Sequence, residues 1–382
     1  MIYLDANSTS RILPEVFETM KPYLTDRFYN PSSPYSAGRE VAKEIEDARE
    51  FFAKSINAET PEEIYFVSCG SEANNWALKS WKRGYVNIIT DTIEHHSVLN
   101  AVNDTTAFAV MRCGIDKFSG KINMANLVDH ILYCRKGYIN RTPPKNILIS
   151  TMWVNNEIGT IQPIEEIGNI SNKYNTYFHV DGVQAYGKIP IDVQANRIDM
   201  LSVSSHKIGA PRGSGFLYIR KGTPLKSFIN GGQQENHMRA GTENVAGIIA
   251  FKKAAEIAMD NMDANYKKLK NIHDTFTKRL EIINGIRIIN KNMPHYPNVL
   301  SVYCGVPAER MVAFLDQYGI YVSSGSACDS HSGRSSHVLK AIGLMDNEAN
   351  STIRISFGPD LTAEDIDYTV RVIETGIDFL TK

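Results

Sequence analysis

Short hydrophobic runs alternate with longer helical stretches along the first two thirds of the chain. Five of these runs are rich in Val, Ile and Leu or aromatic residues, and each is followed by polar residues: Ile64–Ser68, Val86–Thr90, Ile147–Met152, Tyr177–Val180 and Met200–Ser204. Short apolar runs bounded by polar residues predict buried β-strands. Strands that alternate with helices predict an α/β architecture with a mostly parallel sheet.

The pattern changes near residue 255. Beyond it, apolar residues recur at steps of three, four or seven and stop at Gly285, which predicts one face of a long helix: Met262, Tyr266, Leu269, Phe276, Leu280 and Ile283. Short strands follow at Val299–Tyr303, Ile320–Ser323 and Thr352–Phe357, and Thr362 with Asp365 forms a capping-box signal for a last helix. We therefore expect a large α/β domain at residues 1–255, whose N-terminal arm joins a small α+β domain at residues 256–382.

Composition and charge exclude several classes of protein. Of the residues, 43% are hydrophobic and 22% are charged, with a net charge of −1, so nothing favours direct binding to nucleic acid or to an acidic membrane surface. The N-terminus lacks the apolar stretch of a signal peptide, and no window approaches the roughly 18 apolar residues of a membrane span, so we expect a cytoplasmic protein. The five cysteines show no CxxC spacing, which indicates neither a disulfide framework nor a metal site.

Polar residues follow every one of the five predicted strands. In open α/β sheets, ligands bind beyond the carboxyl ends of the strands. These strands are followed by Gly70-Ser71-Glu72, Glu94-His95-His96, Asn155-Asn156-Glu157, Asp181-Gly182-Val183-Gln184 and Ser205-His206-Lys207. The sequence therefore predicts one site at this edge of the sheet.

The chemistry of these groups suits pyridoxal 5′-phosphate (PLP). Gly70 and Ser71 open a helix, whose N-terminal N–H groups favour a phosphate. Lys207 directly after a buried strand can be desolvated and form a Schiff base with an aldehyde. Asp181 ends a hydrophobic strand, where a carboxylate needs a partner such as a protonated pyridine nitrogen. His95 is placed to stack on an aromatic ring or to move protons, and Asn155 and Gln184 to hydrogen-bond a ring oxygen.

Nearly the whole chain resembles the cysteine desulfurases of the nitrogen-fixation and iron–sulfur-cluster type. The blocks that carry the resemblance are Gly70-Ser71-Glu72-Ala73-Asn74-Asn75, Val154-Asn155-Asn156-Glu157-Ile158-Gly159, Val180-Asp181-Gly182-Val183-Gln184, Ser204-Ser205-His206-Lys207, Arg239-Ala240-Gly241-Thr242-Glu243-Asn244 and Ser323-Ser324-Gly325-Ser326-Ala327-Cys328. The resemblance implies the aspartate-aminotransferase-like PLP fold of type I and a homodimer with two shared active sites.

The resemblance also implies a role for each matching residue. Lys207 is the lysine that holds the cofactor, His95 stacks over its ring, and Asp181 pairs with its nitrogen. Asn155 and Gln184 contact the ring hydroxyl. The phosphate is held by Gly70, Ser71, Ser204 and His206, with Thr242 of the partner subunit, and the substrate by Arg354 together with Asn155 and Asn7.

Cys328 matches the cysteine that attacks the sulfur of the substrate. Its segment, Ser323 to Ser336, is rich in Ser and Gly and predicts a mobile loop of the longer class in this family. The implied reaction converts L-cysteine into L-alanine and leaves a persulfide on Cys328 for a sulfur-acceptor protein. Iron–sulfur cluster assembly, tRNA modification and DNA modification are all open as destinations of the sulfur.

Other functions on the same fold stay open at this point. A selenocysteine lyase would use the same residues, whereas another β-lyase or an aminotransferase would have no need of the Cys328 thiol. A non-catalytic scaffold would have no reason to retain Lys207, Asp181 and Cys328 together. The chain departs from the family pattern at Cys69, where a smaller residue is usual, and at Asn236-His237, which replaces a basic residue or glycine.

Overall fold

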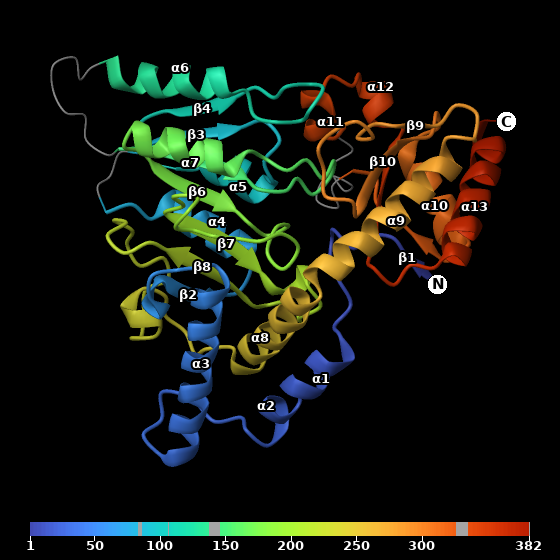
Figure 1. The fold of residues 1–382 in the computed structure, drawn as a ribbon. Helices are drawn as coiled ribbons and strands as arrows, with labels where there is room; N and C mark the ends of the chain where they lie inside the picture. Colours follow the sequence, from blue (N-terminus) through green and yellow to red (C-terminus); the bar gives the residue numbers. More distant parts are fainter. Residues whose placement is uncertain (83–85, 106, 137–145, 326–334, 382) are drawn as a thin grey trace.

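A seven-stranded sheet forms the centre of the larger part of the molecule (Figure 1). The computed structural model describes residues 1–382 except 83–85, 106, 137–145, 326–334 and 382. The strand order is β2-β8-β7-β6-β5-β3-β4. The bounds are β2 Ile64–Val67, β3 Asn87–Asp91, β4 Val110–Cys113, β5 Ile147–Met152, β6 Tyr177–Asp181, β7 Met200–Ser204 and β8 Gly215–Ile219.

The five strands predicted from the hydrophobic runs are all present, and the sheet is mostly parallel as predicted. Strands β4, β3, β5, β6 and β7 pair in parallel. Strand β8 was not among the predicted strands, and it pairs antiparallel with both β7 and β2. The Gly- and Pro-containing segment after Lys207 reverses the chain into β8, so the predicted strand β2 lies beyond β8 at the edge.

Helices cover both faces of this sheet. Helices α4 (Gly70–Lys79) and α5 (His96–Asn103) bury Trp76 and Trp81 against one face. On the other face, Phe52, Phe178 and Phe251 belong to a larger apolar cluster. That cluster is contributed in part by α3 Ser36–Ser55, α6 Met124–Arg135, α7 Ile164–Lys173 and α8 Val245–Asp260. Burial of both faces explains why the parallel strands are continuous hydrophobic runs.

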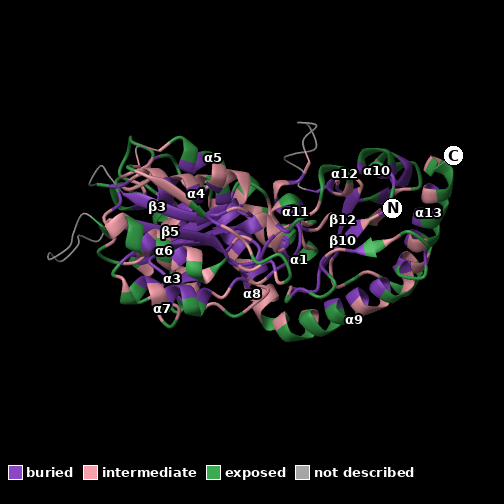
Figure 2. Cartoon of the chain, turned by 90° about the horizontal axis from the view of Figure 1, so that it is seen from above, coloured by how far each residue is buried: buried purple, intermediate pink, exposed green. Residues whose placement is uncertain are grey.

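A long helix leads from the large sheet to a second group of elements (Figures 1 and 2). Helix α9 (Met262–Leu280) confirms the helix predicted there, and it follows α8 after the single residue Asn261. Beyond it, β9 Arg287–Ile288, β10 Val299–Tyr303 and β12 Thr352–Ser356 form an antiparallel sheet. The remaining helices here are α10 Ala308–Gln317, α11 His337–Ala341, α12 Asp346–Ala349 and α13 Ala363–Thr381.

The N-terminal arm also packs with this second group. Strand β1 (Ile2–Tyr3) pairs in parallel with β11 (Ile320–Tyr321), and the arm then runs back past the large sheet to α1 (Pro14–Met20) and α2 (Pro22–Thr25). At the other end of the chain, the hydroxyl of Thr362 accepts from the N–H of Asp365 and the Asp365 carboxylate accepts from Thr362, which confirms the predicted capping box of α13. The division at residue 255 stays a prediction.

Candidate active site

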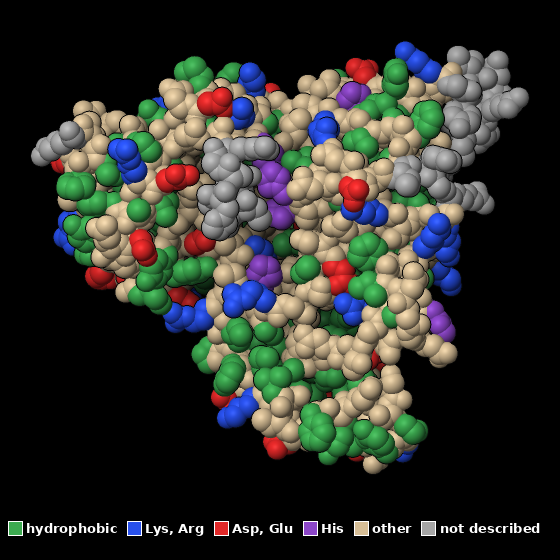
Figure 3. Space-filling model, turned by 180° about the vertical axis from the view of Figure 1, so that it is seen from behind, with side chains coloured by type: hydrophobic (Ala, Val, Ile, Leu, Met, Phe, Trp, Pro, Cys, Tyr) green, Lys and Arg blue, Asp and Glu red, His purple; other side chains and the backbone are tan. Residues whose placement is uncertain are grey.

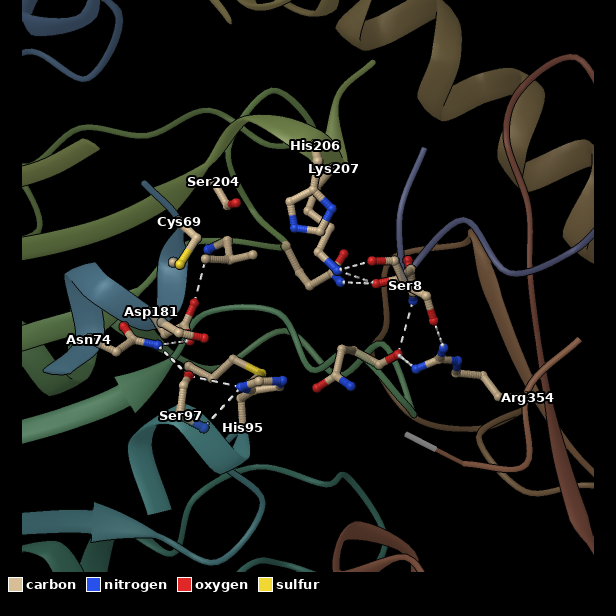
Figure 4. A pocket seen from close by; sticks show the side chains of 17 residues that line it. Ser8, Cys69, Asn74, His95, Ser97, Asp181, Ser204, His206, Lys207 and Arg354 are labelled. Atoms are coloured by element: carbon tan, nitrogen blue, oxygen red, sulfur yellow. Dashed lines mark hydrogen bonds between the residues drawn. The ribbon is translucent and has the colours of Figure 1, made fainter. Parts of the chain in front are cut away.

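A cavity of about 250 Å³ lies at the carboxyl ends of the parallel strands (Figure 4). The large sheet supplies most of its wall, β12 supplies Arg354, and the N-terminal arm supplies Asn7 and Ser8. Of the site residues predicted from the sequence, the cavity wall includes Asn7, Gly70, Ser71, His95, Asp181, Gln184, Ser204, His206, Lys207 and Arg354. Residues from distant parts of the chain therefore meet in one site.

Lys207 is held in place by the N-terminal arm. It lies in a short 3-10 helix, Ser205–Lys207, directly after β7. Its Nζ donates to the backbone carbonyl oxygens of Asn7 at 2.6 Å and Ser8 at 2.7 Å. These two acceptors orient the half-buried amine at the wall of the cavity. The sequence alone did not connect Lys207 with this arm.

Asp181 ends β6 and is 3% exposed. Its Oδ1 accepts from the N–H of Val183 at 3.0 Å, and its Oδ2 accepts from Nδ2 of Asn74 at 2.7 Å. Burial raises the pKa of Asp181, because the low-dielectric surroundings disfavour the charged carboxylate. A cationic ring nitrogen beside it would supply the missing opposite charge.

His95 precedes α5 and caps its N-terminus. Its Nδ1 accepts from the N–H of Ser97 at 3.0 Å and lies 2.8 Å from the Ser97 hydroxyl oxygen. Ser97 is joined in turn to Asn74, whose Nδ2 donates to Ser97 Oγ at 2.9 Å. Asn74 and Ser97 both line the cavity, although sequence reasoning did not single them out. The only signals in the sequence were their positions beside Ser71 and His95.

The start of α4 forms a cradle for an anion. Its N-cap residue, Cys69, makes no side-chain capping bond to the first turn. A Cβ atom at Gly70 would lie 2.6 Å from Cγ2 of Val183 and 3.6 Å from Cβ of Ser204, so the backbone approaches closely there. The hydroxyl of Ser204 is buried without a hydrogen-bond partner in the described part of the chain. The unpartnered Ser204 hydroxyl and the N–H groups at the N-terminus of α4 lie at the same part of the cavity wall. Together they fit a phosphate.

His206 completes this part of the wall. Its Nδ1 lies 3.1 Å from Oγ1 of Thr9. Burial, together with the nearby charges of Lys207 and Arg212, lowers the pKa of His206 to about 4. His206 is therefore a neutral hydrogen-bonding group near pH 7. Together with the amine of Lys207 and the carboxylate of Asp181, these residues fit PLP.

Arg354 provides a buried guanidinium. Its NH2 donates to Oδ1 of Asp5 at 2.6 Å and to the hydroxyl of Ser8 at 2.7 Å, and its NH1 contacts the carbonyl oxygen of Asn156 at 3.3 Å. The side chain is almost fully buried, and Nε has no hydrogen-bond partner among the described residues. Arg354 therefore retains donor capacity for a small anion at the cavity.

Gln184 and Asn7 are more constrained than the sequence indicated. Gln184 donates through Nε2 to the carbonyl oxygen of Asn7 at 2.9 Å, and its Oε1 accepts from Nζ of Lys188 at 2.7 Å. Burial and the charge of Lys207 lower the pKa of Lys188 to about 7. The Asn7 side chain bonds Asn156 and Asn298, so its backbone carbonyl, rather than its amide, faces Lys207 and Gln184.

Among the predicted site residues that the structure describes, Asn155 and Thr242 do not line this cavity. The Asn155 amide donates to the carbonyl of Ile93 and accepts from two backbone N–H groups, so it holds a turn while its neighbour Asn156 lines the cavity. Thr242 is exposed and lines a separate, smaller cavity beside Arg239. Cys328 lies outside the described residues.

The described residues contain no cluster of three or more His, Cys, Asp or Glu side chains arranged to bind a metal ion. Within the same part of the chain, every helix is too short or too polar to cross a bilayer.

Comparison with known proteins identifies the family. Residues 2–369 match the family "Aminotransferase class-V". A "Cysteine desulfurase IscS" of Clostridium botulinum is 40% identical over 97% of this chain and 93% of its own. A solved "NifS-like protein" superposes with a TM-score of 0.89 at 34% identity and covers 99% of this chain and 100% of its own. A solved structure titled "SspA in complex with cysteine" gives a TM-score of 0.80 at 32% identity, with 94% and 99% covered. The chain therefore belongs to the class-V aminotransferase family, within its PLP-dependent cysteine desulfurases.

Proposed function

We propose that the enzyme removes sulfur from L-cysteine, releases L-alanine and leaves a persulfide on Cys328. One observation carries the proposal: Lys207, Asp181, His95 and the unpartnered Ser204 hydroxyl meet Arg354 around one cavity. In the reaction, the Cβ–S bond of the substrate breaks and a bond forms between its sulfur and Sγ of Cys328. A proton takes the place of sulfur at Cβ, so cysteine and thiol become alanine and persulfide.

The residues of the wall divide the remaining work. PLP, when bound, supplies an electron sink for negative charge at the substrate Cα. Lys207 would hold the cofactor aldehyde through its amine, and the same Nζ would move the Cα proton. The carbonyl groups of Asn7 and Ser8 accept from that amine and keep it in position. Asp181 would pair with the ring nitrogen and favour its protonated form.

Arg354 orients the substrate. A guanidinium binds a carboxylate through parallel hydrogen bonds, and Arg354 lines the cavity with an Nε that has no hydrogen-bond partner among the described residues. It reaches the site from β12, which belongs to the antiparallel sheet, whereas the cofactor groups come from the large sheet. The substrate thus lies between the two sheets of the molecule.

We further propose that the enzyme acts as a homodimer. Large hydrophobic side chains are exposed on the part of the molecule formed by α1, α2 and the start of α3, namely Phe17, Leu24, Phe28 and Tyr35 (Figure 3). Contiguous exposed apolar side chains are typical of protein interfaces. Thr242, which is exposed and away from the Lys207 cavity, would then complete the partner's phosphate site.

The activity is tested by incubating the purified enzyme with L-cysteine and a thiol reductant and measuring sulfide and alanine. We expect equal amounts of both products, no turnover with Lys207→Ala or Cys328→Ala, and retained turnover with Cys304→Ala, whose thiol is buried elsewhere. Alanine and sulfide formed without Cys328 would contradict the persulfide step and favour direct β-elimination chemistry. Turnover of selenocysteine alone would make the enzyme a selenocysteine lyase.

The shared sites are tested with mixed dimers of Lys207→Ala and Thr242→Ala chains. If Thr242 serves the partner's site, each mixed dimer contains one intact site and regains up to half of the wild-type activity. If Thr242 serves its own chain, no intact site exists and activity is at most half of that of the Thr242→Ala homodimer. A monomer mass near 42.7 kDa in light scattering of the active enzyme would contradict the dimer itself.

The destination of the sulfur is proposed at the level of chemistry only. A persulfide on Cys328 is passed to an acceptor protein by attack of an acceptor thiolate on its outer sulfur. Iron–sulfur cluster assembly, tRNA modification and DNA modification all use such a donor. We place the enzyme in the cytoplasm, because Cys328 must be kept as a thiol between turnovers and that compartment is reducing.

A further inference from the structure

Four side chains in the cavity wall form a continuous hydrogen-bonded row: Asp181, Asn74, Ser97 and His95 (Figure 4). We infer that Asn74 and Ser97 are positioning residues, which hold His95 as the tautomer with its proton on Nε2 and join it to Asp181 in one unit. The inference rests on the proposed function, in which Asp181 is the partner of the ring nitrogen and His95 stacks on the ring.

The tautomer follows from the bonds to Nδ1 of His95. The backbone N–H of Ser97 donates to this atom at 3.0 Å, and a backbone N–H can only donate. Nδ1 must therefore accept, and a neutral ring then carries its proton on Nε2. The bond is a helix cap, because His95 is the N-cap residue of α5. The fold of the chain thus sets the protonation pattern of His95.

The direction of the other bonds supports the same tautomer. Nδ2 of Asn74 faces Oδ2 of Asp181 at 2.7 Å, and the opposite orientation of the amide would place two oxygen atoms in contact. The second N–H of this amide donates to Ser97 Oγ. The Ser97 hydroxyl accepts this bond and is free to donate its own proton to Nδ1 of His95, 2.8 Å away. Nδ1 then faces two donors.

Burial makes this arrangement specific. Asn74 is 1% exposed and Asp181 is 3% exposed, so neither can replace its bonds with bulk water. Asn74 Oδ1 is buried without a hydrogen-bond partner among the described residues, which shows that the amide is oriented by its two donor bonds. An unmade bond inside a protein is expensive, so removal of Asn74 or Ser97 disturbs both ends of the row.

This tautomer has a chemical consequence. With Nδ1 occupied, His95 enters the reaction as a hydrogen-bond donor through Nε2. Nε2–H can donate a hydrogen bond to a substrate group, but transfer of that proton would leave an imidazolate anion, so the neutral ring acts here by hydrogen bonding. Asp181, which would contact the ring nitrogen, is joined to His95 through Asn74 and Ser97. A loss of positive charge at the ring nitrogen would therefore be coupled to a change in the orientation of His95.

The tautomer is tested by NMR of 15N-histidine-labelled enzyme purified with its cofactor. His95→Gln identifies the two ring signals of His95. In the wild type we expect the shift of an unprotonated Nδ1 and a protonated Nε2. Ser97→Ala removes one donor, which lowers the ratio of the Nε2–H to the Nδ1–H tautomer by about fivefold, the effect of one ordinary hydrogen bond. Ser97→Thr keeps the hydroxyl and restores the wild-type ratio.

The absorption band of the bound cofactor and kcat test the Asp181 end of the row. Asn74→Leu keeps the shape of the side chain but removes both donors, so we expect a shifted absorption band of the bound cofactor and a lower kcat. Asn75→Ala is the matched control, since the amide of Asn75 bonds the carbonyl oxygen of Ser71 within α4 and no other described residue. We expect the control to leave the band, the tautomer ratio and kcat unchanged.

The outcomes separate this inference from the proposed function. A protonated Nδ1 in the wild type, or an unchanged tautomer ratio in Ser97→Ala, would overturn the positioning role even if the enzyme desulfurates cysteine normally. An Nε2–H tautomer that depends on Ser97, in an enzyme that does not act on cysteine, would sustain the positioning role and remove the proposed function. If Asn74→Leu does not fold, Ser97→Ala and Ser97→Thr still decide the question.

Discussion

A buried ion pair far from the cavity gives a sharp test of how this fold is stabilised. Arg49 of α3 donates two parallel hydrogen bonds to Glu235, at 2.8 and 2.9 Å, and both residues are almost fully buried. The carboxylate of Glu235 also accepts from the N–H of Phe66 in β2 at 2.8 Å. Glu235 therefore joins α3, the sheet edge and the segment that leads to Thr242. We expect Glu235→Ala to be strongly destabilising.

The magnitude follows from what the substitution leaves behind. Without Glu235, the Arg49 guanidinium is still buried, and its remaining carboxylate partner is Glu46, whose side chain is 61% exposed. Breaking a buried ion pair from one side costs about 3–5 kcal/mol in other proteins. The N–H of Phe66 loses its acceptor as well. Glu46→Ala removes the exposed partner of the same arginine, and for this matched control we expect a loss below about 1 kcal/mol.

The assay is urea unfolding of the three proteins at one protein and cofactor concentration, because dimerisation and ligand binding both shift apparent stability. The free energy of unfolding is compared only where the dependence on urea is unchanged. A loss within about 1 kcal/mol for Glu235→Ala, or an equal loss for Glu46→Ala, would refute the reasoning, since the stability would then not depend on a desolvated charge pair.

Three further predictions concern strain, pH and substrate binding. His237 is exposed with φ +64°, a conformation that costs an L-residue about 1–2 kcal/mol. After the entropy cost of glycine is subtracted, His237→Gly should raise the free energy of unfolding by about 0.5–1 kcal/mol. A less stable variant would contradict this prediction. The Nε2 atoms of His273 and His295 lie 2.9 Å apart, and burial, with the charge of His295, lowers the pKa of His273 from 6.5 to about 4. As the pH drops, His273 therefore binds its proton in the unfolded chain before it does so in the folded chain, so the free energy of unfolding should fall between pH 6.5 and pH 4. In urea titrations, His273→Phe should reduce this dependence on pH. An unchanged dependence would assign it to other groups. Arg354→Lys should raise KM for cysteine by about tenfold or more with a smaller change in kcat, because an ammonium cannot replace a planar guanidinium, and an unchanged KM in sulfide-release kinetics would remove Arg354 from substrate binding.

The hydrophobic pattern was sufficient to predict the edge of the sheet where the site lies. Strands β5 and β7 have the predicted bounds; Asp181 is the last residue of β6, one residue beyond the predicted end of that strand, and Lys207 follows β7 as expected. Such runs are readable because both faces of a parallel sheet are buried, which leaves little polar alternation. The antiparallel strand β8 is also buried, but it follows a turn rich in Gly and Pro, so its pairing between β2 and β7 was not visible in the sequence.

Contacts between distant segments could not be predicted from the sequence. Spacing placed Asn155 at the strand end but did not show that its amide is used within a turn while Asn156 reaches the cavity. The Asn236-His237 departure was visible, whereas a left-handed conformation at Glu235, Asn236 and His237 in succession was not. That conformation is tolerated because the buried bonds of Glu235 fix the start of the segment.

The row from Asp181 to His95 explains why such contacts matter for function. Each member is an ordinary polar residue in the sequence, and Asn74 and Ser97 lie on different helices, 23 positions apart. Only the packing of α4 against α5 brings them together and gives each bond its direction. A motif can therefore indicate that a histidine is present at a site, but the surrounding helices decide which of its nitrogens carries the proton. For this enzyme, Asn74 and Ser97 lie in the cavity wall and act through their hydrogen bonds, without taking part in the reaction themselves.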